Sequence, residues 1–220
     1  MVPIDYSTLQ ARTRARLNAG TDDPWVVNVD EYVNEALHLL EASAPDGWPW
    51  MRKTLTLTTT ASTQTYSFTV IGALDTPDVT VSKVLGARVL RSTVYVPLRL
   101  MSQEEAWQCY PSTTTGVPEA WYAEGQTFYL YPSPDAVYDI PIRVVTVETD
   151  LGGATSTPML PVVFHSAIVD AAAMLAYTQV QDDLHVQAMQ ANVVGWVERM
   201  KRYGREYVGA PKIKVRDWLA

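Results

Sequence analysis

Apolar side chains recur with helical spacing near both ends of the chain and with a period of two between them. Residues 5–17 combine polar N-cap candidates with basic residues at the far end, which predicts a short first helix. Residues 29–44 carry apolar side chains three and four positions apart, which predicts a second helix. The same spacing predicts a helix over residues 184–208, and a largely apolar stretch that begins near Pro161 predicts another over residues 160–181.

Helix start signals support these assignments. Asn28 precedes Glu31 by three positions, which is the spacing of a capping box. Ser102 and Glu105 have the same spacing and predict one or two helical turns inside the region of strands. Pro161 lies near the first turn of the third expected helix, where its missing backbone donor has no helical partner to lose.

The middle of the chain, residues 54–147, is rich in threonine, valine and tyrosine and is punctuated by proline and glycine. Its period-two alternation predicts antiparallel strands. Residues 65–70, "TYSFTV", are one of the expected strands. Pro141 interrupts another, and because proline cannot donate to a ladder we expect an edge strand or a bulge there.

The order of these elements predicts the architecture. Two short N-terminal helices are marginal alone, so we expect them to pack on the two C-terminal ones. The sequence therefore predicts an α+β protein: a small four-helix bundle with an inserted antiparallel β domain and an extended C-terminal arm. The bundle takes residues 1–50 and 158–208, the β domain takes residues 51–157, and the arm takes residues 209–220.

The stretch "DGWPW" stands where the second expected helix gives way to strands. Pro49 ends regular helix, and Trp48 and Trp50 provide large flat ring surfaces. We interpret these three residues as the joint at which the bundle and the β domain pack together. The alternative is a platform on which a sugar ring stacks.

The third expected helix is apolar nearly all round. So small a bundle cannot easily bury such a helix alone, so we expect part of it to lie in a subunit interface. We interpret residues 160–177 as a buried helix and not a membrane span, because the segment is at the short limit and contains His165 and Asp170. The residues expected to pack between subunits are Phe164, Ile168, Ala171, Ala172 and Leu175.

Charge is distributed unevenly along the chain. The 220 residues carry a net charge of -7, which gives no electrostatic basis for tight binding to a DNA duplex. The end of the chain alternates basic and apolar residues, a pattern suited to strand addition or groove docking, whereas the alternative is a frayed basic tail. The residues of this expected docking arm are Lys212, Ile213, Lys214, Val215, Arg216, Trp218 and Leu219.

The sequence holds no compact catalytic or metal-binding motif. His38, His165 and His185 lie in separate helical segments, and the single cysteine, Cys109, has no neighbouring histidine. No phosphate-binding glycine loop or nucleophile elbow is present. We therefore expect no enzymatic activity, no catalytic residues, no metal site and no cofactor.

Three stretches, taken in order, resemble the head-to-tail adaptor (connector) proteins of tailed bacteriophages, in particular the podovirus-type tail-tube adaptors. They are "DGWPWMRKTLTLTTTASTQTYSF" at residues 46–68, "VPEAWYAEGQTFYLYPSPDAVYDIPIRVV" at residues 117–145 and "MLPVVFHSAIVDAAAMLAY" at residues 159–177. The departure from the family pattern is at residues 140–145, where a proline and an arginine stand in a strand that is tyrosine-rich in the family.

The resemblance implies a virion protein, assembled in the host cytoplasm, that forms a homo-oligomeric ring, commonly of twelve copies. The ring would lie beneath the portal protein at the head-to-tail interface, with tail or neck proteins attached below and the C-terminal arm reaching toward the portal. Double-stranded DNA would pass through it transiently and without sequence specificity, and an acidic wall would suit that passage because like charges repel. No membrane partner is implied.

Two other functions stay open on the sequence alone. A neck stopper or tail-completion protein of the same virion would share this composition. A carbohydrate-binding or carbohydrate-active β domain would use the tyrosines and tryptophans as stacking surfaces, and an active one would need two close carboxylates, which adjacent acidic pairs do not supply.

Overall fold

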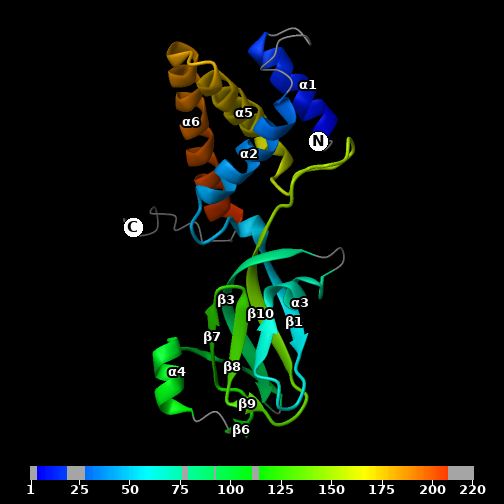
Figure 1. Cartoon of the computed structure of the whole chain (residues 1–220), viewed down its shortest axis with the longest axis vertical. Coiled ribbons are helices and arrows are strands. Elements are labelled where there is room, and N and C mark those ends of the chain that lie inside the picture. The colour runs from blue at the N-terminus through cyan, green and yellow to red at the C-terminus, as the bar shows by residue number, and fades with distance from the viewer. Residues whose placement is uncertain (1–3, 19–27, 76–78, 92, 111–113, 208–220) are drawn as a thin grey trace, which may run out of the picture. The chain divides into compact units, whose positions relative to one another are not determined.

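The computed structural model describes five stretches of the chain: residues 4–18, 28–75, 79–91, 93–110 and 114–207 (Figure 1). Within them the protein is a mixed α+β protein, so the prediction of fold class is confirmed at this level. Long helices occupy the two ends of the described chain, and strands occupy the middle.

The contacts divide the chain into two compact units, which are described one at a time. The helical unit consists of Met1–Trp50 together with Asp150–Ala220, and the β unit consists of Met51–Thr149. Residues 150–157, which the sequence analysis assigned to the β domain, group with the helices.

Residues 150–157 group with the helices because their backbone bonds to helix α1 (Tyr6–Leu17). The amide of Tyr6 donates to the carbonyl oxygen of Ser156 at 2.8 Å. The first turn of a helix has amide donors without partners inside the helix, and this segment supplies acceptors for two of them, since the amide of Ser7 also donates to the carbonyl oxygen of Ala154 at 3.1 Å. Its loop-like composition gives no sign of that role.

Four long helices are described in the helical unit, and α5 contacts each of the other three. This arrangement explains the apolar character of α5, since neighbours cover it on several sides. The helices are α1 (Tyr6–Leu17), α2 (Val29–Ala42), α5 (His165–Gln179) and α6 (Asp183–Tyr207), with a short 3-10 turn, Val162–Phe164, before α5.

One of the two predicted capping boxes supplies its N-cap hydrogen bond. Ser102 precedes α4 (Gln103–Cys109), and its hydroxyl accepts from the amide of Glu105 at 3.1 Å. The prediction for Asn28 is wrong, because its side chain makes no capping hydrogen bond. Its backbone, at φ -94° and ψ 18°, lies outside the extended region from which an N-cap side chain reaches back to the helix.

The described residues of the β unit form two four-stranded sheets and one two-stranded sheet. The first sheet has the order β1-β10-β3-β4 and is antiparallel; the second has the order β2-β8-β7-β5. The prediction of a purely antiparallel domain is wrong at two short pairs, β5 with β7 and β6 with β9, which are parallel. The strands are β1 (Arg52–Thr58), β2 (Thr65–Ser67), β3 (Thr80–Arg91), β4 (Val94–Pro97), β5 (Arg99–Leu100), β6 (Thr115–Gly116), β7 (Ala120–Glu124), β8 (Thr127–Tyr131), β9 (Ser133–Pro134) and β10 (Asp139–Val147).

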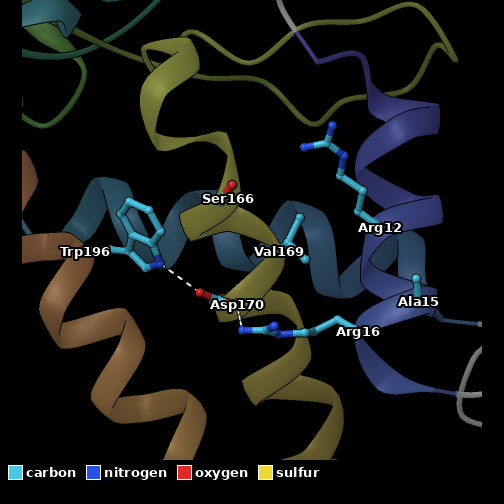
Figure 2. Close-up of a pocket in the computed structure, with 7 residues that line it drawn as sticks. All are labelled: Arg12, Ala15, Arg16, Ser166, Val169, Asp170 and Trp196. Carbon is cyan, nitrogen blue, oxygen red and sulfur yellow. Dashed lines mark hydrogen bonds and ion pairs between the residues drawn. The ribbon is translucent and has the colours of Figure 1, made fainter.

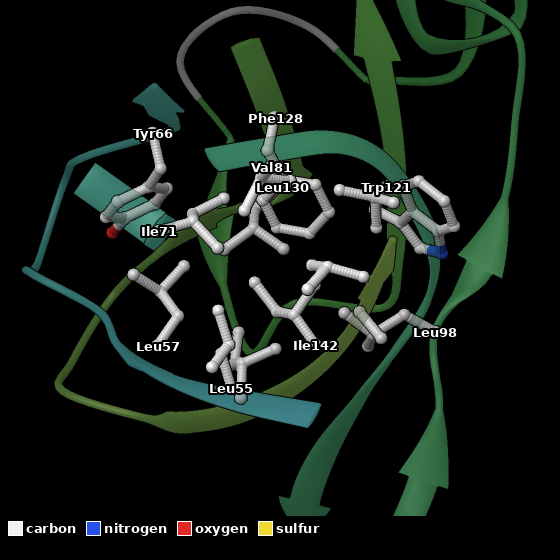
Figure 3. Packing of buried hydrophobic residues seen from close by; sticks show 14 of the residues in the cluster. Leu55, Leu57, Tyr66, Ile71, Val81, Leu98, Trp121, Phe128, Leu130 and Ile142 are labelled. Carbon is white, nitrogen blue, oxygen red and sulfur yellow. The ribbon is translucent and has the colours of Figure 1, made fainter. Parts of the chain in front are cut away.

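Both four-stranded sheets contribute to one apolar core in the β unit (Figure 3). Ile140 and Ile142 come from β10, Phe128 and Leu130 come from β8, and all four are fully buried. Each such side chain contributes roughly 1.5–3 kcal/mol through the apolar surface it removes from water. The period-two pattern predicts this core because alternate residues of a strand share a face.

A short helix replaces the second half of a predicted strand. Helix α3 (Phe68–Gly72) follows β2 directly, and the hydroxyl of Ser67 caps it by accepting from the amide of Val70 at 3.2 Å. A side chain at Gly72 would not fit, since its Cβ would lie 2.0 Å from the carbonyl oxygen of Val79. The cap and the glycine thus override the alternation in "TYSFTV".

Pro141 lies in a central strand, so the expectation of an edge strand is wrong. It stands opposite Thr56 of β1, and pairing with β3 begins one residue later, at Ile142. The missing amide donor therefore costs no hydrogen bond to β3. The register shifts with β3 occur after Arg143 and Val145, beyond the proline.

Candidate functional site

A pocket of about 450 Å³ opens on the helical unit between α1, α5 and α6 (Figure 2). Helix α1 contributes arginines and an alanine, α5 forms the floor, and α6 contributes an indole ring. The side chains of Arg12 and Arg16 extend from α1 toward α5. The lining residues are Arg12, Ala15, Arg16, Ser166, Val169, Asp170 and Trp196.

Asp170 links the three helices at the pocket floor. Its Oδ1 accepts an ion-paired hydrogen bond from Nη2 of Arg16 at 2.8 Å, and its Oδ2 accepts from Nε1 of Trp196 at 2.8 Å. The Asp170 side chain is 11% exposed and that of Arg16 is 45% exposed. Both carboxylate oxygens are therefore engaged, and the pocket presents guanidinium groups, an indole and a hydroxyl to an entering molecule.

Two further guanidinium groups lie around this link. The exposed Arg12 lines the pocket, and it makes no salt bridge with any residue that the structure describes. The guanidinium carbon of Arg199 lies 4.8 Å from the ring centroid of Trp196, a cation–π contact. The lining thus holds two arginines against one carboxylate, with Arg199 beside it on Trp196, which makes this surface basic on a protein of net charge -7.

The sequence analysis did not find this pocket. Arg12 and Arg16 are four apart and so share one side of α1, which is a signal the sequence does carry. As a sequence pattern, the basic residues of that segment indicate only the C-terminal end of a helix, where positive charge is stabilising. Asp170 and Trp196 are 26 positions apart and meet only because α5 and α6 pack together, so no local spacing could pair them.

The aromatic stretch at residues 48–50 packs within the helical unit. Trp48 is buried, and its Nε1 donates to the carbonyl oxygen of Leu40 at 2.9 Å. The rings of Trp48 and Trp50 stack with centroids 5.0 Å apart. Because Trp48 is enclosed, its ring offers no open face for a sugar.

Trp50 and Pro49 connect this stretch to the ends of α5 and α6. The Trp50 ring lies 6.1 Å from those of both Phe164 and Tyr203. A Cβ added at Gly204 would lie 3.3 Å from the ring carbons of Pro49, so the glycine permits close approach. These contacts fix where the chain leaves the helices. Whether the same residues also join the β unit stays a prediction.

Most of the residues assigned to subunit packing are covered by the chain's own helices. Phe164, Ile168, Ala171 and Ala172 are buried, and only Leu175 is partly exposed. The inference from an apolar helix to a subunit interface underestimated how much of α5 its three neighbours cover. Residues of the expected docking arm, 209–220, lie outside the described residues.

The histidines occupy unrelated environments. His165 is buried, its Nδ1 accepts from the amide of Ile4 at 3.3 Å, and its Nε2 donates to the carbonyl of Leu160 at 2.9 Å. Burial lowers its pKa, since the charged ring would lose water. His38 is exposed, and its hydrogen bond to Asp150 raises its pKa.

The described part of the chain holds no cluster of three or more histidine, cysteine, aspartate or glutamate side chains that could bind a metal ion. One helical window, Val162–Gln179, is long and apolar enough to cross a membrane by composition, with a mean hydropathy of 1.2. Since 56% of that window is buried inside the helical unit, it also has the character of a core helix.

These features define a two-unit α+β protein with a basic pocket on its helical unit. The chain matches the family model described as SU10 adaptor protein over residues 4–207 and belongs to that family. No curated protein matches it. The resemblance to phage adaptors is thereby confirmed, and the protein is a structural adaptor component of a bacteriophage virion that interacts with other virion proteins.

Proposed function

We propose that this adaptor forms a homo-oligomeric ring beneath the portal protein and joins it to tail or neck proteins. The observation that carries the proposal is the family match over residues 4–207, which spans both units. The ring places many identical docking surfaces around one axis, as closed cyclic symmetry requires. The copy number we propose is twelve, the number that the family resemblance implies.

Exposed apolar side chains on each unit support docking to other proteins. Leu184 and Val194 on α6 are 77% and 57% exposed. On the β unit, Trp107 of α4 is 77% exposed and Leu100 of β5 is 65% exposed. Such residues are candidates for contact surfaces in an assembly.

The remaining parts of the proposal concern the C-terminal arm and the central channel of the ring. Residues 209–220 dock on the portal, with basic side chains alternating with Ile213 and Val215 in the manner of an added strand. DNA passes through the ring without sequence-specific contacts, because the net charge of -7 disfavours adhesion to phosphates. The four long helices act as one bundle, and the protein performs no catalytic step.

Electron microscopy of the purified full chain, alone and with its portal protein, tests the proposal. We expect rings with an axial hole, either free or on the portal. A protein that stays a monomer in both samples would rule out the ring. Deletion of residues 209–220 should leave the thermal unfolding unchanged and abolish binding to the portal; retained binding would refute the arm's role.

A further inference from the structure

The pocket between α1, α5 and α6 has the chemistry of a carboxylate receptor. Arg12 is exposed and Arg199 stacks on Trp196, so two guanidinium groups remain beyond the one that Asp170 occupies. The hydroxyl of Ser166 lines the same pocket from the first turn of α5, where the helix dipole is positive. Guanidinium groups bind carboxylates through paired hydrogen bonds.

The outer side of α2 carries the matching charge. Its buried residues, which include Tyr32, Val33 and Ala36, share one side of the helix. Glu31 and Glu35 are exposed on the opposite side, one turn apart, and neither makes a salt bridge with any residue that the structure describes. The nearby pair of His38 and Asp150 adds a second exposed carboxylate region.

These two surfaces lie on opposite sides of the helical unit. Helix α5 contacts α1, α2 and α6, and in Figure 2 α2 crosses behind α5, away from the side chains that line the pocket. A basic surface on one side and an acidic surface on the other cannot meet within one chain. They can meet between copies arranged head to tail, which is the contact that closes a ring.

We propose that the pocket receives the carboxylates of Glu31 and Glu35 from a neighbouring copy of this chain. The inference rests on the proposed ring and specifies one of its contacts. Arg12 and Arg199 bind the carboxylates, while the Arg16–Asp170–Trp196 link holds the pocket open and fixes the indole. The occupant is a second copy because α2 supplies the required charge and points it outward.

Charge reversal tests this contact in whichever assembly the wild-type chain forms, free rings or rings on the portal. The variants are Arg12→Glu, Glu35→Arg, and Arg14→Glu as a control on the same helix, with Arg14 outside the pocket lining. Sedimentation velocity measures assembly, and circular dichroism melting checks folding. We expect Arg12→Glu and Glu35→Arg each to weaken assembly by about tenfold or more, with little effect from Arg14→Glu.

Mixing the two folded variants supplies the decisive result. In an alternating ring, the altered pocket meets the altered α2 and the native pocket meets the native α2, so the mixture should assemble as the wild type does. Assembly of both single variants at wild-type concentrations, or failure of the mixture, would overturn the pocket contact while leaving the ring intact. Absence of any wild-type ring would overturn the proposed function as well.

Discussion

The two units keep their folds by different means. In the β unit, ladders of backbone hydrogen bonds hold strands around a core cluster of apolar side chains. In the helical unit, the side chain of Asp170 on α5 links that helix to α1 through Arg16 and to α6 through Trp196. The indole of Trp48 ties the chain that follows α2 to the carbonyl oxygen of Leu40. Both units bury apolar side chains, but backbone pairing joins the elements of the β unit, whereas individual side-chain hydrogen bonds add to the packing between helices in the helical unit.

Trp48→Ala should give the largest effect on stability and confine it to the helical unit. The change removes a buried indole, its hydrogen bond to Leu40 and its stacking on Trp50. We expect a loss of about 3–5 kcal/mol, as for large aromatic truncations in cores. Calorimetry should show the helical transition shifted and the β transition retained; equal shifts in both would show that the units unfold together. Trp50→Ala, at a partly exposed ring, should cost less.

Ile142→Ala should produce the converse result. Ile142 is fully buried in the β-unit core, on the central strand β10. The cavity and the lost burial should cost about 2–5 kcal/mol of the free energy of unfolding. The expected measurement is a lowered transition for the β unit with an unchanged helical transition. Ile142→Val is the matched control, with a loss of about 0.5–1.5 kcal/mol.

Asp170→Ala tests whether one carboxylate holds three helices. It removes the acceptor for both Arg16 and Trp196, but Arg16 is partly in water, which screens the pair. We expect the helical unit to lose about 1–2 kcal/mol in chemical unfolding. The fluorescence of Trp196 should also change in Asp170→Ala, because its indole Nε1 loses the carboxylate to which it donates. Asp170→Asn should retain more of the stability, and identical losses would argue against the link.

The pH response should also separate the units, since all three histidines lie in the helical unit. The pKa of buried His165 is lowered, so the unfolded chain binds a proton first as the pH falls. Stability is therefore lost on acidification below the unfolded pKa of about 6.5. His38 acts in the opposite sense, because its pKa is raised in the folded protein. The stability that it contributes is fully present below its unfolded pKa and is lost as the pH rises through its folded pKa.

Because His165 is almost fully buried and His38 is exposed, the His165 effect should dominate. Melting followed from about pH 8 to about pH 5.5 should lower the helical transition and leave the β transition in place. His38→Gln should deepen the loss at acid pH by removing the opposing contribution. An unchanged helical transition across this range would contradict a lowered pKa for His165.

The difference between local sequence patterns and contacts made by distant residues explains which features the sequence could predict. The α+β class, the four long helices and the strand-rich middle follow from periodicity, and the Ser102 cap follows from local spacing. Asn28 and residues 68–70 were predicted wrongly because backbone geometry at the cap and close packing at Gly72 decide those sites. The pocket could not be predicted, since the Asp170–Trp196 hydrogen bond depends on how α5 packs on α6.

Trp107 gives the smallest expected effect on stability and tests the surface of the β unit. Its ring is 77% exposed on α4, so Trp107→Ala should change the free energy of unfolding by no more than about 0.5 kcal/mol. Trp121→Ala, in the core of the same unit, should cost about 3–5 kcal/mol and provides the contrast. A large exposed ring that contributes little to folding is expected to act in contacts with other proteins, because its apolar surface gains by leaving water. If the proposed portal-bound rings form, electron microscopy with tail or neck proteins should show fewer attached complexes for Trp107→Ala at unchanged melting temperature. A lowered β transition would instead show that the Trp107 indole serves the fold.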